Sequence, residues 1–367
     1  MMKEIRDILL AYDKAVASGT KTALATVVKI EGSSYRQPGA RMLVTEDGLL
    51  TGAISGGCLE GDALRKALLC ISLRQNKLIT YDTSTDEDMA LGVQLGCNGI
   101  IHILFEYVDE AQAVNPVAIL RDAVSERSES VIGTLFSEKK QDTQPGTRFL
   151  MRSDEEQGFP ESLRTHALSV LSDKQSAVVH YEDTKLALLS YHPKPVHVVI
   201  NGAGNDVIPV VKAANLIGWY VTVADGRATH ATINRFPEAG CVRMGNPKSI
   251  IENTVIDSQT YVVLMAHNYQ YEFELLKLLL RQDDIPYIGI LGPKTKFHKL
   301  LGDLSDAGIN ISESQMERLF GPVGLDIGAE TAEEIAISII AEIKSVISRR
   351  NGTSLKFRKD SIHSAMP

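Results

Sequence analysis

The sequence predicts an α/β protein in which a mixed α/β domain is followed by a doubly wound parallel sheet. Three observations support this prediction. In the second half of the chain, apolar strand-like runs alternate with helix-like segments, which is typical of a parallel sheet with crossover helices. A glycine-rich turn, Gly202-Ala203-Gly204, directly follows one of these runs. The chain has 367 residues, 44% of them hydrophobic, and this is enough to build two cores.

The first half is predicted to combine helices with short strands. Residues 3–16 carry apolar side chains at helical spacing and predict an amphipathic helix. Another helix is predicted directly after Cys58, over residues 59–69. Glu46-Asp47-Gly48 lies between two extended runs and indicates a hairpin. The predicted strands of this half are residues 22–30, 41–45, 49–54, 78–82, 100–107, 176–182 and 186–191. Residues 110–192 are more polar, and we interpret them as the outer layer of the first domain.

A proline-rich linker, His192-Pro193-Lys194-Pro195, is expected to separate the domains, because neither proline nor the residue before it continues regular structure easily. The predicted domains are residues 1–192 and 195–348, and residues 349–367 form a polar C-terminal tail. In the second domain we expect strands at residues 196–200, 219–224, 261–266 and 287–291, and helices at residues 208–216, 271–281, 294–301 and 331–347.

The turn with Gly202 and Gly204 matches most of the dinucleotide fingerprint of a Rossmann-like βαβ unit. Asp225 lies 23 residues after Gly202, where an acid contacts a ribose hydroxyl in such folds, although it could equally cap the following turn. Two residues depart from the pattern. Val207 replaces the third glycine, and Asp206 places a negative charge where a phosphate would bind. NAD(P) or another nucleotide is therefore a possible but weakly supported ligand, and Arg227 leaves the choice between NAD and NADP open.

Two cysteines, Cys58 and Cys97, have glycines on both sides. Glycine lets the backbone adopt positive φ or approach a ligand closely, so each thiol would be uncrowded by neighbouring side chains. A small packing thiol beside a turn is the alternative interpretation. Four cysteines without a Cys-x-x-Cys pair predict neither a disulfide framework nor a zinc site.

Composition excludes several classes of function. A formal charge of −8 and a pI near 5.7 disfavour nonspecific binding to nucleic acid. No apolar run approaches the roughly 18 residues of a membrane span. The first residues lack the apolar core of a signal peptide, so we expect a cytoplasmic protein.

Six segments together resemble the XdhC/CoxI family, the xanthine dehydrogenase accessory proteins. They are residues 32–42, 52–61, 95–99, 202–204, 287–292 and 321–336. The resemblance covers both halves in the same order, and it implies an N-terminal XdhC/CoxI domain and a C-terminal XdhC Rossmann domain. Pro293 departs from the family, whose members usually carry a small hydroxyl residue there.

The resemblance also implies a function, that of a chaperone for molybdenum cofactor (molybdopterin). Such a protein would hold the cofactor for sulfuration, with a cysteine desulfurase as partner. It would then deliver the cofactor to xanthine dehydrogenase or a related molybdenum hydroxylase, and so serve purine catabolism. A homodimer is expected from the general frequency of such assemblies.

The residues suit this cargo, because molybdopterin carries a phosphate, a flat pterin and a metal bound through sulfur. In the first half, Gly56 and Gly57 could expose main-chain amides to an anion, and Cys58 and Cys97 could supply soft ligands, with Cys58 the candidate metal ligand. Arg36 and Arg41 bracket a Pro-Gly turn and could clamp a phosphate, unless they are merely solvated hairpin charges.

Two other functions stay open at this point. Gly202, Gly204 and Asp225 taken alone would suit an NAD(P)-dependent oxidoreductase, but no catalytic residue can be assigned for it. A sulfurtransferase in which Cys58 carries a persulfide overlaps with the chaperone and differs only in whether sulfur passes through the protein.

Overall fold

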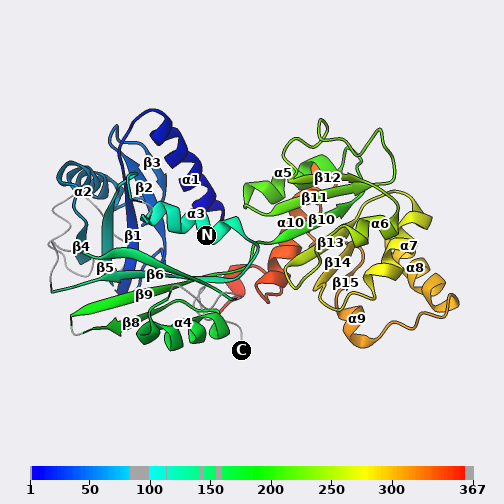
Figure 1. Cartoon of the computed structure of the whole chain (residues 1–367). Coiled ribbons are helices and arrows are strands. Elements are labelled where there is room, and N and C mark those ends of the chain that lie inside the picture. Colours follow the sequence, from blue (N-terminus) through cyan, green and yellow to red (C-terminus); the bar gives the residue numbers. More distant parts are fainter. Residues whose placement is uncertain are drawn as a thin grey trace. The chain divides into compact units, whose positions relative to one another are not determined.

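The computed structural model describes residues 2–82, 99–112, 114–139, 144–153, 159–182 and 184–359. The chain forms two compact units, residues 1–194 and 195–367 (Figure 1). Among the described residues, none of the helices combines the length and the apolar character that crossing a bilayer requires.

In its described residues, the first unit contains two antiparallel sheets and four helices. The five-stranded sheet has the order β3-β2-β1-β5-β4, with β1 at Thr22–Gly32, β2 at Arg41–Thr45, β3 at Leu50–Gly52, β4 at Lys77–Asp82 and β5 at Gly99–Val108. The four-stranded sheet has the order β7-β6-β9-β8, with β6 at Ser130–Phe136, β7 at Gly146–Arg152, β8 at Ala177–Tyr181 and β9 at Lys185–His192. The helices are α1 (Met2–Ala17), α2 (Glu60–Leu73), α3 (Pro116–Ser125) and α4 (Glu161–Asp173).

These elements stack as helix, sheet, sheet, helix. One face of the five-stranded sheet packs on α2 through a core that includes Met42 and Ala67. Its other face meets the second sheet through an apolar cluster that includes Leu104 and Leu188, and the far face of the second sheet is covered by α4. Helices α1 and α3 pack beside this interior in a further apolar cluster. Residues 110–192, interpreted above as an outer layer, therefore supply a complete second sheet with its own covering helix.

The second unit is built on a parallel six-stranded sheet, which confirms the predicted doubly wound architecture. Its order is β12-β11-β10-β13-β14-β15, and the strands are β10 (His197–Asn201), β11 (Tyr220–Asp225), β12 (Cys241–Met244), β13 (Thr260–Leu264), β14 (Tyr287–Ile290) and β15 (Leu319–Phe320). The helices are α5 (Val207–Leu216), α6 (Pro247–Glu252), α7 (Tyr269–Leu279), α8 (Lys294–Asp306), α9 (Glu313–Glu317) and α10 (Ala332–Ile347), followed by the short 3-10 helix η2 (Leu355–Phe357).

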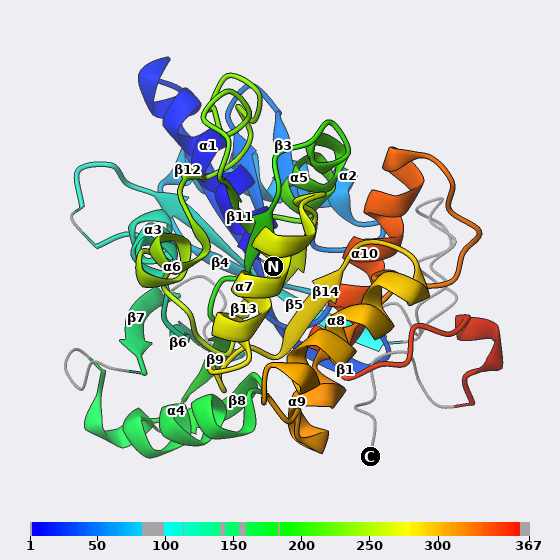
Figure 2. The same ribbon diagram turned by 90° about the vertical axis from the view of Figure 1, so that its right-hand side faces the viewer.

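Helices cover both faces of this sheet. α5 and α10 share one apolar core with it, whereas α7 and α8 belong to a second core on the opposite face (Figure 2). The order of strands reverses at β10, which has β11 on one side and β13 on the other. In doubly wound sheets the crevice at the carboxyl ends of the two strands that flank such a reversal is the usual place for ligands. The Gly202–Gly204 turn directly follows β10 and therefore lies at this crevice.

Candidate functional site

The turn that carries Cys58 connects β3 to α2 and is closed by its own hydrogen bonds. The hydroxyl of Ser55 accepts from the amides of Gly57 (3.2 Å) and Leu59 (3.1 Å). In return, Glu60 at the start of α2 accepts from the Ser55 amide (3.0 Å) with one carboxylate oxygen and from the Ser55 hydroxyl with the other. The turn is therefore fastened to the first turn of the helix and does not depend on a ligand for its shape.

This closure changes the expected anion site at Gly56 and Gly57. The Gly57 amide already donates to Ser55, so it is occupied. The amides of Gly56 and Cys58 have no hydrogen-bond partner among the described residues. Gly57 has a φ of 109°, in the left-handed region that favours glycine, and a Cβ there would meet nothing within 4 Å. Two amides are therefore free to bind an anion beside the thiol.

Cys58 is a free thiol and is partly exposed, with its buried side packed against the core beneath α2. Cys70 of the same helix is fully buried and lies 3.7 Å from the carbonyl oxygen of Phe105, and burial raises the pKa of its thiol to about 12. Cys70 is therefore a packing residue. Cys97 lies outside the described residues, which resume at Gly99.

Tyr35 is a residue of this site to which sequence reasoning gave no separate role. Its side chain is 68% exposed. The ring lies against the Cys58 turn, because a Cβ built on Gly56 would be 3.5 Å from two of its atoms. An exposed aromatic face beside two unpaired amides and a thiol can stack on a planar ligand. The sequence alone does not pair Gly56 with Tyr35, because the two residues lie on separate loops that meet only in the folded protein.

Arg36 and Arg41 both contact Glu4 of α1, which differs from the predicted phosphate clamp. The guanidinium of Arg36 forms an ion pair with one oxygen of the Glu4 carboxylate. The other oxygen accepts a hydrogen bond from the Arg41 amide at 3.2 Å. Glu4 therefore holds the loop that carries Tyr35 against α1, and the charge of Arg36 is already balanced.

The side chain of Arg41 is only 1% exposed, since this strand position faces the second sheet. Its guanidinium donates to the carbonyl oxygen of Gly39 (3.0 Å) and to the hydroxyl of Ser190 (3.3 Å). Burial lowers the pKa of Arg41 to about 10, and the charges of Glu106 and Glu4 oppose this shift. Arg41 thus remains a cation at neutral pH, but a structural one with no access to a surface ligand.

Other polar groups share this interior between the sheets. The carboxylate of Glu106 accepts from the amide (2.6 Å) and hydroxyl (2.8 Å) of Thr147. Burial nevertheless raises the pKa of Glu106. His192 contacts Ser190 at 3.2 Å, and its pKa is lowered well below the ordinary value by burial and by Arg41. We refer to Arg41, Glu106, Thr147, Ser190 and His192 as the buried polar layer.

In the described part of the chain, one group of side chains has the spacing of metal ligands. Ligand atoms of Glu31, His102 and Glu138 lie within 4.8 Å of one another. The ammonium group of Lys29 lies 2.8 Å from Glu31 and 2.7 Å from Glu138, so a side chain already supplies the balancing cation. Cys58 is not part of this group. As a metal ligand it would therefore supply a single sulfur atom to a metal whose other ligands come from elsewhere.

In the second unit, the glycine turn is shaped by close approaches. Gly202 has a φ of 136°, and a Cβ on it would lie 2.1 Å from the carbonyl oxygen of Met265 after β13. A Cβ on Gly204 would lie 2.2 Å from a carboxylate oxygen of Asp206. Val207, at the position of the missing third glycine, is completely buried in the core beside α5. Gly202 is therefore required by the fold whether or not a nucleotide binds, whereas the contact at Gly204 is with the end of a side chain that can move.

Asp225 is committed to structural hydrogen bonds. It accepts from the amide of Ala203 (2.8 Å) and from three nitrogens of Arg227, namely the amide, Nε and Nη2, at 2.7 to 2.9 Å. Burial would raise its pKa, but the bonds from Arg227 and Ala203 outweigh burial and lower it. Arg235 holds the other side of the turn by donating to the Ala203 carbonyl at 2.7 Å. The expected ribose contact would therefore require Arg227 to move.

Asp206 lies at the start of α5 and pairs with His267, whose Nε2 is 2.8 Å from a carboxylate oxygen. His267 follows β13 and has a φ of 52°, in the left-handed region. The carboxylate thus lies near the helix start at which a pyrophosphate binds in nucleotide-binding members of this fold, but it makes no hydrogen bond to the amides there. That Asp206 weakens nucleotide binding stays a prediction.

Comparison with known proteins shows consistent similarities for both units. Residues 15–82 match the model of the XdhC and CoxI family, and residues 198–343 match the model of the XdhC Rossmann domain. A probable xanthine dehydrogenase subunit of Bacillus subtilis (strain 168) is 29% identical over 337 residues, covering 90% of this chain and 94% of that protein. The molybdenum cofactor insertion chaperone PaoD of Escherichia coli (strain K12) is 24% identical over 346 residues, covering 93% of this chain and 88% of PaoD.

A solved structure extends this similarity to the fold. The crystal structure of a xanthine dehydrogenase from Bacillus halodurans superposes with a TM-score of 0.74 at 29% sequence identity. The superposition covers 95% of this chain and 98% of that one, so the likeness includes both units.

Proposed function

The chain belongs to the XdhC/CoxI family, and from this premise we propose that it binds molybdenum cofactor at the Cys58 turn, holds it for sulfuration and delivers it to xanthine dehydrogenase or a related molybdenum hydroxylase. The names of two full-length relatives, a molybdenum cofactor insertion chaperone and a probable xanthine dehydrogenase subunit, support the role of accessory protein to a molybdenum enzyme. A cysteine desulfurase as sulfur donor and assembly as a homodimer are further parts of the proposal.

One observation carries the choice of site, namely that three kinds of contact meet at one turn. The amides of Gly56 and Cys58 are free to donate to a phosphate. The ring of Tyr35 offers an exposed face on which a pterin can stack. The thiol of Cys58 is a soft ligand suited to a metal or to sulfur. No other thiol among the described residues has this combination of neighbours.

In this proposal the two arginines act indirectly. Arg36 is paired with Glu4, and Arg41 is buried, so neither is available to clamp a phosphate. Together they fix the loop that presents Tyr35. Because the cargo then meets few unpaired cations, its phosphate would be bound mainly by main-chain amides, whose contribution is modest at an exposed site.

The partly exposed thiol also supports the sulfurtransferase as a second candidate. In that reaction the thiolate of Cys58 attacks the terminal sulfur of a persulfide on the desulfurase, takes up that sulfur and releases the desulfurase cysteine as a thiolate. An NAD(P)-dependent oxidoreductase has less support, because Asp225 is occupied by Arg227 and Asp206 lies at the phosphate position.

The test is expression of the full chain in a host that makes the cofactor, followed by measurement of released pterin fluorescence and molybdenum content. We expect Cys58→Ala and Tyr35→Ala to retain several-fold less cofactor than the unmodified protein. Tyr35→Phe should retain it, because the ring is kept. Cys241→Ala is the matched control, since Cys241 is also a partly exposed free thiol but lies on β12 of the second unit.

Equal cofactor content in Cys58→Ala, Cys241→Ala and the unmodified protein would overturn the assignment of the site. Mass spectrometry after incubation with a desulfurase and cysteine separates the two candidates. A persulfide on Cys58 supports sulfur transfer through the protein, whereas normal sulfuration of bound cofactor without it supports a chaperone alone.

A further inference from the structure

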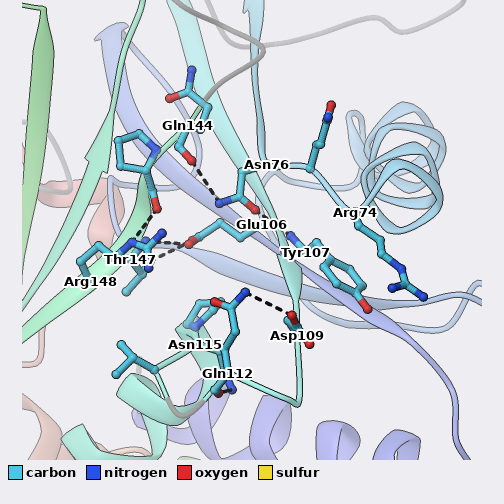
Figure 3. A pocket seen from close by; sticks show the side chains of 14 residues that line it. Arg74, Asn76, Glu106, Tyr107, Asp109, Gln112, Asn115, Gln144, Thr147 and Arg148 are labelled. Atoms are coloured by element: carbon cyan, nitrogen blue, oxygen red, sulfur yellow. Dashed lines mark hydrogen bonds between the residues drawn. The ribbon is translucent and has the colours of Figure 1, made fainter.

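A cavity of the first unit lies at the opposite end of α2 from Cys58. It has a volume of 310 Å³ and is bounded by the end of α2, the start of β4, the end of β5, the start of α3 and the start of β7 (Figure 3). Cys58 precedes the first residue of α2, whereas Arg74 of the cavity follows the last one. A helix of 14 residues is about 21 Å long, so the two places are separate.

Two arginines on the walls of this cavity have guanidinium groups available for a ligand. Arg74 makes no side-chain hydrogen bond or ion pair with any described residue. Arg148 uses only its Nε, which donates to the carbonyl oxygen of Pro145 at 2.8 Å, and both terminal nitrogens are free among the described residues. Exposed arginines elsewhere in the unit differ, since Arg121 is bound to Asp13 through both terminal nitrogens.

The cavity also carries two acids. Glu106 lies at its base, held by two hydrogen bonds from Thr147, and burial raises its pKa. The carboxylate of Asp109 accepts from the amide of Ala111 and from the side chain of Gln112, both at 3.1 Å, so it is bonded within its own loop. Among these charged groups of the lining, the two arginines are the ones whose terminal nitrogens are left to donate to an anion.

The remaining lining is polar and already ordered. Asn76 donates to the carbonyl oxygen of Gln144 (3.3 Å) and accepts from the amide of Tyr107 (3.0 Å). Asn115 caps α3 by accepting from the amide of Ala118 at 2.9 Å. Figure 3 shows these side chains directed around one hollow, with Arg74 and Arg148 on different sides of it.

We propose that this cavity binds a small metabolite carrying a phosphate or carboxylate group, with Arg74 and Arg148 as its charge partners. Guanidinium groups suit this role, because each offers two parallel N–H donors that match the oxygens of a phosphate or a carboxylate. The volume falls at the lower end of the range for small-molecule sites. The proposal does not rest on the cofactor-handling function, and each can fail without the other.

The test is calorimetric titration of the full chain, at constant ionic strength, with inorganic phosphate in one arm and succinate in the other. We expect at least one of the two anions to bind saturably, and the better one identifies the class of ligand. Arg74→Gln and Arg148→Gln should each weaken that binding by at least about tenfold. Both side chains are exposed, so neither substitution disturbs the core.

Arg121→Gln is the control, because Arg121 is an exposed arginine of α3 whose charge is already paired with Asp13. It should leave the affinity unchanged. Glu106→Gln should preserve or tighten binding, since it removes the one buried acid at the base. Absence of saturable binding of both anions, or equal weakening in Arg121→Gln and the two cavity variants, would overturn the proposal.

Discussion

Replacing Arg41 by methionine tests the buried polar layer between the two sheets. Methionine has a similar length but no charge, so it relieves the cost of burying a guanidinium. That cost follows from the pKa of Arg41, which burial lowers from 12.5 to about 10. A shift of this size corresponds to roughly 3 kcal/mol against the buried cation. The substitution also removes the hydrogen bonds to Gly39 and Ser190, whose loss costs about 1 kcal/mol each.

The deciding effect concerns Glu106, whose buried charge Arg41 partly compensates. Without Arg41 the pKa of Glu106 rises further above its ordinary value. A carboxyl with a raised folded-state pKa binds its proton more tightly in the folded state, so the free energy of unfolding falls as the pH rises from the unfolded pKa towards the folded one. Leaving the buried carboxylate without its partner costs about 3 kcal/mol or more, which exceeds the net gain of about 1 kcal/mol from the two effects above. We therefore expect Arg41→Met to cost about 2 kcal/mol near pH 8, and at least about 1 kcal/mol less near pH 5.

The assay is urea denaturation of the full chain near pH 5 and near pH 8, followed by circular dichroism, for Arg41→Met, Glu106→Gln and the double variant. The double variant should be more stable near pH 8 than the sum of the single effects predicts, and this coupling should fade near pH 5. The only tryptophan, Trp219, is buried in the second unit, so its fluorescence transition serves as an internal control. Equal destabilisation at both pH values, together with an additive double variant, would refute the reasoning.

Two further predictions concern the second unit. Gly202→Ala should lower its free energy of unfolding by at least about 3 kcal/mol, followed by tryptophan fluorescence, because the new Cβ would meet the Met265 carbonyl oxygen at 2.1 Å. Gly302 lies inside α8, and a Cβ there would meet nothing within 4 Å. Gly302→Ala should therefore be neutral or stabilise the unit by up to about 1 kcal/mol. A similar loss of stability in both variants would contradict the steric argument. Asp206→Asn removes a negative charge from the start of α5 and should therefore tighten the binding of NAD, NADP or ATP by about tenfold, measured by calorimetry. Unchanged affinity would show that the carboxylate does not oppose the phosphate.

The second unit could be predicted well because its signals are local. Strands β10, β13 and β14 are continuous apolar runs and each is followed by a helix within a few residues, so the pattern appears along the sequence itself. The short elements β12, α6, α9 and β15 were not predicted. The first unit was harder. α3, α4, β6 and β7 were not predicted, although Asn115 and Pro116 form a recognisable cap at the start of α3. Strand β6 pairs with β9 across a separation of at least 50 residues, and no local pattern indicates such a partner.

The same distinction between local and distant contacts applies to the candidate sites. The pairing of Asp225 with Arg227 spans two residues and could have been anticipated from their proximity. The burial of Arg41 could not, because it depends on a second sheet whose Ser190 lies 149 residues further along the chain. Tyr35 belongs to the same class, since its contact with Gly56 joins two separate loops. Residue types thus indicated the chemistry, whereas tertiary packing decided which side chains can reach a ligand.

The fastening of the Cys58 turn to α2 through Ser55 and Glu60 has a consequence for the release of a ligand. A turn that is preorganised in this way loses little conformational entropy when it binds, so its contacts are converted efficiently into affinity. The same bonds hold the turn in one shape whether or not a ligand is present, so the turn itself supplies no opening movement that could expel a ligand. If cargo is held there, we expect the receiving enzyme to take it by offering tighter contacts, and this can be tested by measuring whether the rate of transfer depends on the concentration of that enzyme.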